Sequence, residues 1–280
     1  MRLAPLALAG LVFASPAVAS AELETTDEIR ACIRRNTPEI TSLQAVEFSS
    51  RDRTGGTRTT RVNIASRRTP TGHRRLLAQV TAPEEVKNTS FLISEGESGI
   101  SMSVYSPDFE APKTITGGDA SGRLFGTDFS YEDFERLQGF NWDDEGLWLT
   151  RLEDSRTADR PTYVLETRPQ QSAYSRILSF VDKETCVALR TEFYENGTQL
   201  RKVLIADPQE IRRLDEAWFP HDLMMMDLRD QTQSRLVVQS VNTGLELPAF
   251  DPMQPLPIPK LEAELPKPNF EELDVGTELR

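Results

Sequence analysis

Apolar and polar residues alternate along two neighbouring segments, 189–194 and 198–205. Because successive side chains of a strand point to opposite faces, Leu189 and Phe193 would share one face of the first segment. The intervening Asn196-Gly197 pair suits a type I′ turn, whose two central residues adopt positive φ angles. The pattern therefore predicts a β-hairpin with one apolar face and one charged face.

The returning segment of this hairpin alternates less cleanly. Leu200, Lys202 and Leu204 would share one face. Val203 and Ile205 would lie on the other. Since both faces carry apolar groups, we expect another part of the chain to cover part of the second face.

Similar short segments recur along the chain, each bounded by proline or glycine turn signals. They comprise a hairpin over residues 43–64 and further strands at 74–80, 90–94, 99–105, 148–152, 162–167, 176–181, 223–228 and 235–241. No long helices alternate with these segments, which argues against βαβ units. The sequence therefore predicts a mainly β fold built on an antiparallel sheet.

A short amphipathic helix is expected before the first strand. Thr25 and Glu28 have the spacing of a capping box, and Ile29 and Ile33 lie one helical turn apart. Pro38 ends the pattern.

The alternating pattern typical of strands ends after Pro107. A glycine-rich stretch, 115–123, leads into a segment with four aromatic side chains, at Phe125, Phe129, Tyr131 and Phe134. Each fully buried aromatic contributes about 2 kcal/mol or more, so this segment is expected to lie on apolar surface. Ser130 is a favoured helix N-cap, which predicts a helix of one or two turns lying across the sheet.

The two ends of the chain differ in composition from the middle. Residues 1–21 combine Arg2, an apolar run and small residues, which is the pattern of a cleaved secretory signal peptide. Residues 22–250 would form the β domain. Residues 251–280 are acidic and rich in proline, so we expect a disordered tail. The mature protein should be soluble and exported.

Charge limits the class of partner. The formal net charge of −12 argues against a nucleic-acid-binding protein, because phosphate binding needs a basic surface. Residues 51–75 nevertheless contain eight arginines and a single acid, Asp52. This basic stretch is either a solvated outer face or a patch for anionic head groups or an acidic partner.

The sequence contains two cysteines, Cys32 and Cys186. In an oxidising compartment they can form a disulfide. It would close a loop of about 150 residues and contribute roughly 4 to 5 kcal/mol to stability. The alternative is a pair of buried thiols that do not bond to each other.

Little in the sequence suggests catalysis. His73 and His221 have no Cys, Asp or Glu cluster at ligand spacing, so we expect no metal and no other cofactor. The motifs of nucleophilic catalysis and phosphate binding do not occur. The acidic run Asp143-Asp144-Glu145, with Glu132 and Asp133, could supply paired carboxylates to a hydrolase, but it also has the composition of a turn. We expect no enzymatic activity.

Three consecutive methionines, Met224 to Met226, suggest a binding surface, because methionine is flexible and suits apolar surfaces that accept varied partners. Alternation places Met224 and Met226 on one face of a strand and Met225 on the other. The alternative is ordinary core packing.

Residues 124–133 have the sequence Leu-Phe-Gly-Thr-Asp-Phe-Ser-Tyr-Glu-Asp, and weaker signals accompany it at 75–77, 82–92, 176–184 and Trp218-Phe219-Pro220. Together with the export signal and the successive strands, these runs resemble the outer-membrane lipoprotein-sorting family, relatives of the periplasmic lipoprotein carrier LolA. The resemblance spans roughly residues 41–250 and rests mainly on the run at 124–133.

That resemblance implies a curved, open antiparallel half-barrel whose concave face is covered by short helices. It also implies a hydrophobic hollow that shields a lipid or acylated protein in transit through the periplasm, and no catalytic residues. The expected ligand-binding residues are Phe125, Phe129, Tyr131 and Phe134 as a lid, Met224 and Met226 lining the hollow, and Phe91 and Met102 on neighbouring strands. A competing interpretation is that the aromatic segment fills the sheet permanently and leaves no cavity.

The resemblance also bears on partners. It implies binding of lipid or lipoprotein acyl chains and cooperation with an inner-membrane transporter of the resistance-nodulation-division (RND) type. We further expect a monomer that makes peripheral membrane contact and binds no nucleic acid. An alternative function, suggested by the basic stretch and the proline-rich tail, is a non-enzymatic scaffold for envelope assembly or transport.

Overall fold

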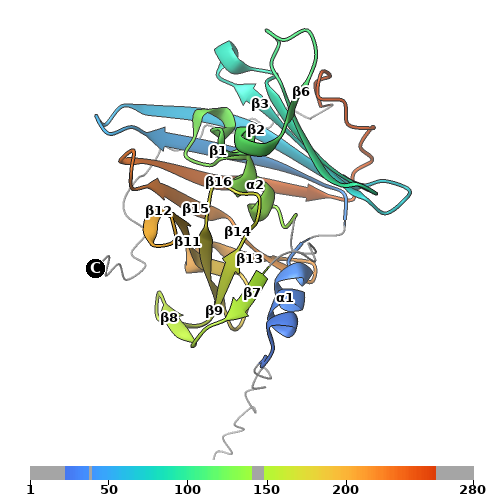
Figure 1. The fold of residues 1–280 in the computed structure, drawn as a ribbon. Helices are drawn as coiled ribbons and strands as arrows, with labels where there is room; N and C mark the ends of the chain where they lie inside the picture. The colour runs from blue at the N-terminus through green and yellow to red at the C-terminus, as the bar shows by residue number, and fades with distance from the viewer. Residues whose placement is uncertain (1–22, 38–39, 141–147, 257–280) are drawn as a thin grey trace, which may run out of the picture.

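A curved antiparallel sheet forms most of the protein, as a computed structural model of residues 23–37, 40–140 and 148–256 shows (Figure 1). The sheet has two free edges, β6 and β7, and so does not close into a barrel. The expected mainly β, open half-barrel is confirmed. The predicted signal peptide lies outside the described residues.

Fourteen strands of the described chain form this sheet, in the order β6-β5-β4-β3-β2-β1-β16-β15-β12-β11-β10-β9-β7, with β8 paired to β9. Their bounds are β1 Ser42–Arg51, β2 Thr57–Arg68, β3 Arg74–Ala82, β4 Ser90–Gly96, β5 Gly99–Tyr105, β6 Lys113–Ile115, β7 Trp148–Arg151, β8 Ser155–Thr157, β9 Arg160–Arg168, β10 Arg176–Asp182, β11 Ala188–Glu195, β12 Gln199–Ala206, β15 Asp222–Asp227 and β16 Thr232–Thr243. A separate hairpin joins β13 (Ile211–Leu214) to β14 (Ala217–Pro220).

The predicted hairpin around Asn196-Gly197 is present as β11 and β12. Asn196 and Gly197 have φ angles of 50° and 83°, as a type I′ turn requires. A register shift follows Phe193, which pairs with Lys202 across the two strands. This pairing puts a lysine on the same face as the buried Phe193, and it positions the site described below.

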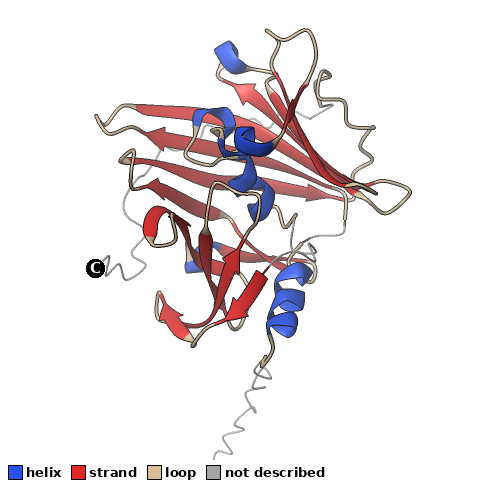
Figure 2. Ribbon diagram, in the orientation of Figure 1, coloured by secondary structure: helices blue, strands red, loops and turns tan. Residues whose placement is uncertain are grey.

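The last strand joins the two halves of the sheet. β16 pairs with β1 on one side and with β15 on the other. The N-terminal strands β1 to β6 and the C-terminal strands β7 to β12 and β15 therefore form one continuous surface, which Figure 2 shows curving around the helices.

Both α-helices lie on the concave side of the sheet. α1 (Thr26–Arg35) starts at Thr25 with the predicted capping box, and it packs through Ile29 against Tyr163, Leu165 and Val181. α2 (Tyr131–Leu137) starts at Ser130 and lies across the middle of the sheet (Figure 1). Four 3₁₀ turns are η1 Glu84–Val86, η2 Gly117–Ser121, η3 Leu124–Gly126 and η4 Pro208–Glu210. No described helix has the length and apolar character needed to cross a membrane.

Residues 244–256, the C-terminal strap, cross the convex face. Phe250 and Leu256 are buried there against Leu43, Ala65, Leu77 and Leu92. The strap is also hydrogen-bonded to strand side chains: Ser90 Oγ donates to the Pro252 carbonyl at 2.6 Å, and the Leu256 amide donates to Gln79 Oε1 at 2.9 Å. Residues 251–256, which we expected to be disordered, lie on the sheet: Leu256 is buried in the cluster, and the carbonyl oxygens of Pro252 and Gln254 accept hydrogen bonds from Ser90 and Gln79. Residues 257–280 lie outside the described part.

The basic stretch of residues 51–75 is divided by the fold. Arg51, Arg53 and Arg58 lie around the β1–β2 turn, whereas Arg67, Arg68, Arg74 and Arg75 lie around the β2–β3 turn at the opposite end of β2. Arg67 is used by the strap, since its guanidinium donates to the carbonyl oxygens of Leu247 and Pro248, both at 2.7 Å. The arginines therefore do not form a single patch.

Candidate functional site

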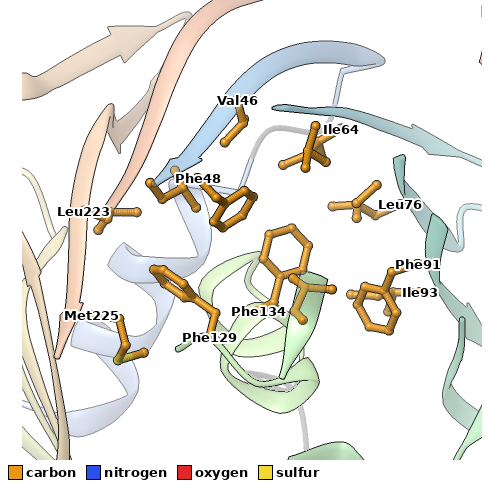
Figure 3. Packing of buried hydrophobic residues seen from close by; sticks show 14 of the residues in the cluster. Val46, Phe48, Ile64, Leu76, Phe91, Ile93, Phe129, Phe134, Leu223 and Met225 are labelled. Carbon is orange, nitrogen blue, oxygen red and sulfur yellow. The ribbon is translucent and has the colours of Figure 1, made fainter. Parts of the chain in front are cut away.

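The aromatic segment packs onto the concave face. Phe129 and Phe134 have no exposed surface. The Phe129 ring meets Phe48 edge to face with centroids 5.7 Å apart, and the Phe134 ring lies 6.1 Å from that of Phe91. Figure 3 shows these rings pointing toward one another between β1 and β4. Two of the expected lid residues and Phe91 are therefore part of the core.

Phe125, Tyr131 and Met102 are half-buried at the border of the same cluster. The Phe125 ring lies 6.4 Å from that of Phe48, and the Tyr131 ring lies 5.0 Å from that of Phe91. Burial also raises the pKa of the Tyr131 phenol. The segment thus fills the concave face over the N-terminal strands. The competing interpretation expected such filling over the whole sheet, with no cavity left.

Asp128 anchors the segment to β16. Its carboxylate is buried and accepts hydrogen bonds from Ser234 Oγ at 2.7 Å and Thr232 Oγ1 at 2.5 Å. The Asp128 amide in turn donates to Ser234 Oγ at 2.9 Å. Arg123 forms an ion pair with the carboxylate at 3.1 Å. Asp128 therefore attaches the segment of residues 124–133 to β16, the last strand of the sheet.

Asp133 anchors the start of α2 to β12. It completes a capping box with Ser130, and its Oδ2 accepts from Lys202 Nζ at 2.8 Å. Its Oδ1 accepts from the Tyr174 hydroxyl at 2.8 Å. Lys202 also donates to the Asp128 carbonyl at 2.7 Å. This buried ion pair joins the aromatic segment to the C-terminal half of the sheet.

Sequence reasoning did not identify Lys202 as part of this site. A signal was available, because alternation predicted Lys202 on the same strand face as the apolar Leu204. The register shift after Phe193 places Leu200 on the other face, with Val203 and Ile205. A lysine at such a position is expected to be paired when buried. Its partner, Asp133, is 69 residues away in the sequence, and only the fold brings them together.

Glu132, the neighbour of Asp133, is buried and accepts a hydrogen bond from Ser172 Oγ at 2.9 Å. Burial raises the pKa of its carboxyl, an effect that the charge of Asp133 adds to and that Arg136 opposes. Together with the Asp133–Lys202 pair, this assigns Glu132 and Asp133 to interactions within the protein. Asp143, Asp144 and Glu145, the other proposed carboxylates, lie outside the described residues.

The raised pKa predicts how Glu132→Gln affects stability. In the wild-type protein, burial of the ionised Glu132 carboxylate lowers the free energy of unfolding. This loss disappears as the pH falls through the folded-state pKa of Glu132 toward the unfolded-state pKa of about 4.3, because the carboxyl then becomes protonated. The variant should therefore be more stable than wild type at pH 7.5, and its advantage should shrink toward pH 5, as measured by urea unfolding. Exposed Glu85→Gln is the matched control. A difference that does not change with pH would contradict this assignment.

The aromatic segment does not fill the whole concave face. A cavity of about 210 Å³ remains between the end of α2, the end of α1 and strands of the C-terminal half. Its apolar wall includes Leu137, Phe193, Leu204, Leu223, Leu236 and Val238. Asn36, Thr37, Gln44 and Gln138 add uncharged polar groups. An apolar cavity of about 150 Å³ can hold benzene, so this one has room for a hydrocarbon segment of roughly eight carbons.

Met224 and Met226 do not lie where the sequence analysis expected them. On β15 the residues that join the concave core are Leu223 and Met225, which Figure 3 shows beside Phe129. Met226 lies with Val203 and Ile205 in a different cluster, and neither Met224 nor Met226 borders the cavity. Alternation was predicted correctly, but the face that turns toward the hollow was not.

The end of α1 is held at the cavity by a disulfide. Cys32 and Cys186 are bonded, with their Cα atoms 5.8 Å apart, so the expected pairing is confirmed. Asn36 strengthens the attachment, because its side chain donates to the Thr185 carbonyl at 2.8 Å and accepts from the Trp218 amide at 2.9 Å. Asn36, Cys186 and Trp218 all border the cavity. The disulfide therefore secures one wall of it.

Solved structures with the same fold include a protein described as an outer membrane lipoprotein-sorting protein domain, from Vibrio parahaemolyticus. It is 23% identical, covers 78% of this chain and 93% of its own, and has a TM-score of 0.68. A DUF1329 family protein from Desulfovibrio piger is 20% identical, with 78% and 92% coverage and a TM-score of 0.69. A LolA superfamily protein from Nitrosomonas europaea is 17% identical, with 81% and 96% coverage and a TM-score of 0.63. At these identities the likeness establishes the fold.

Sequence comparison identifies the family to which the chain belongs. A search among curated proteins found no match. A family model described as "Uncharacterized protein" matches residues 72–250, which is more than half of the 280-residue chain. The matched range contains the aromatic segment, Lys202 and most of the cavity wall. The chain therefore belongs to this family, and it has the fold of LolA superfamily and outer membrane lipoprotein-sorting proteins.

Proposed function

We propose that this protein is a periplasmic carrier that shields an acyl chain of a lipid or lipoprotein from water. The observation that carries the proposal is the cavity of about 210 Å³ on the concave face, next to an aromatic segment tied to the sheet by buried polar contacts. Burial of roughly eight methylene groups supplies on the order of 6 kcal/mol before the costs of binding, at about 0.8 kcal/mol each.

The fold supports the same proposal. The Vibrio parahaemolyticus structure is described as an outer membrane lipoprotein-sorting protein domain. A hollow of this kind would shield an acylated cargo from water. The signal-peptide pattern of residues 1–21 and the disulfide both suit an exported protein, because disulfides persist in oxidising compartments. Cargo exchange with an RND-type inner-membrane transporter, by a monomeric carrier that touches the membrane peripherally, is part of this proposal. No catalytic reaction is proposed.

Filling the cavity tests the proposal. Val238 borders the cavity and is 7% exposed, whereas its neighbour Val237 is half-buried on the opposite face of β16. Val238→Phe should weaken binding of a fluorescent fatty acid at least tenfold, because the larger ring occupies the space of the guest. Val237→Phe adds the same volume elsewhere and should bind like wild type.

Two further measurements complete this test. Mass spectrometry of lipid extracts from protein purified from its native host should detect a bound lipid with wild type and Val237→Phe, and much less with Val238→Phe. Thermal unfolding of each variant confirms that the fold is retained. Equal probe binding by wild type and a folded Val238→Phe variant would refute the proposed site, as would wild-type protein that carries no lipid and binds no probe.

A further inference from the structure

Two charged side chains border the cavity, Asp133 and Arg136. The Asp133 carboxylate is already satisfied, since it accepts from Lys202 Nζ, the Tyr174 hydroxyl and the Ser130 amide, each at 2.8 Å. Its negative charge is therefore balanced within the protein. Arg136 is therefore the charged side chain of the cavity wall that is available to a bound guest.

One donor of the Arg136 guanidinium, its Nε, is not used by the described residues. It lies in the last turn of α2, and its Nε is buried without a hydrogen-bond partner in the part of the chain described. Glu132, one turn earlier, interacts with it electrostatically, but the Glu132 carboxylate accepts its hydrogen bond from Ser172. A guanidinium presents five N–H donors in a planar fork that matches a carboxylate or phosphate.

The remaining polar groups at the cavity carry no charge. Gln44, Gln138 and Thr37 are uncharged. Asn36 is engaged at both side-chain atoms by Thr185 and Trp218. The surface available to a guest is therefore an apolar wall with a single cationic group beside it. Such a surface should attract an anion, and should disfavour a cation.

We propose that the cavity is specific for anionic amphiphiles, whose carboxylate or phosphate head is bound by Arg136 while the hydrocarbon lies against Leu204, Leu236 and Val238. This inference rests on the proposed function and narrows its cargo to a class. The cavity volume matches about eight carbons, so a medium-length chain or the end of a longer chain is held.

Four amphiphiles of eight carbons each test this proposal: octanoate, octyl phosphate, octanol and octylamine. Each is titrated against delipidated full-length mature protein loaded with the neutral fluorescent probe N-phenyl-1-naphthylamine. Octanoate or octyl phosphate should displace the probe at concentrations at least tenfold lower than octanol, and octylamine should be weaker than octanol. The two anions separate a fatty-acid carboxylate from a lipid phosphate as the preferred head.

Variants of Arg136 test whether this residue causes the preference for anionic ligands. Arg136→Gln should reduce the advantage of the anions over octanol to less than twofold. Arg136→Lys should keep part of it. Arg212→Gln, at an exposed arginine, should behave like wild type. A preference for anions that survives Arg136→Gln would overturn the inference.

The wild-type comparison distinguishes the two proposals without any variant. If octanol displaces the probe and octanoate is no better, the anion specificity fails while the carrier function stands. If no ligand displaces the probe and the probe itself does not bind, the carrier function fails as well.

Discussion

Replacing Cys32 and Cys186 by alanine is expected to lower the free energy of unfolding by about 4 to 5 kcal/mol. The bond links residues 154 apart in the sequence, and a crosslink over so long a loop removes much conformational entropy from the unfolded chain. Urea unfolding of the oxidised wild type and of the double variant measures the difference. Wild type unfolded in the presence of a reductant should match the variant.

The same variant should also lose bound guest, because the bond holds the end of α1 against the cavity. Ile33, Asn36 and Thr37 form this part of the wall. Each single variant, Cys32→Ala or Cys186→Ala, should resemble the double variant, since either removes the crosslink. A loss of less than about 1 kcal/mol would show that packing of Ile29 against Tyr163 and Leu165 holds α1 without the disulfide.

Lys202→Met is expected to cost about 3 kcal/mol of unfolding free energy. Lys202 and Asp133 are both buried, with side-chain exposures of 8% and 1%, so removal of the cation leaves an uncompensated carboxylate in the core. The Tyr174 hydroxyl still donates to Asp133, which keeps the expected cost at the lower end of the range for broken buried pairs. Chemical unfolding at pH 7.5 measures the loss.

A double variant separates the ion pair from simple packing. Lys202→Met with Asp133→Asn should be more stable than Lys202→Met alone, because the amide no longer carries a buried charge. Lys87→Met removes an exposed lysine paired with Glu84 and should change stability by less than about 1 kcal/mol. Additive losses in the double variant would mean that the two residues do not act as a pair.

The strands were predictable because each carries its own signal. The hairpin at Asn196-Gly197 follows from local turn chemistry, and both residues adopt the positive φ angles that this turn needs. The caps at Thr25 and Ser130 follow equally from neighbours three residues away. Short elements such as β6, β8 and the β13–β14 hairpin were missed, because three or four residues are too few to show alternation.

The candidate site was only partly predictable. The aromatic run was correctly expected to lie on apolar surface, and Phe129 and Phe134 are fully buried. Whether that run would cover a hollow or fill it depends on how far it extends over the sheet. In the fold it fills the concave face over the N-terminal strands and leaves a cavity beside the C-terminal ones.

The sequence by itself determined the local pattern: the strands and their alternation, the helix caps, the class of fold and the two cysteines available to pair. Only the tertiary structure decided which face of β15 turns inward, that Lys202 meets Asp133, and that Arg136 borders a cavity. The physical reason is that alternation is a property of neighbours with period two, whereas the inward face, a buried ion pair and an unfilled volume depend on segments far apart in the chain.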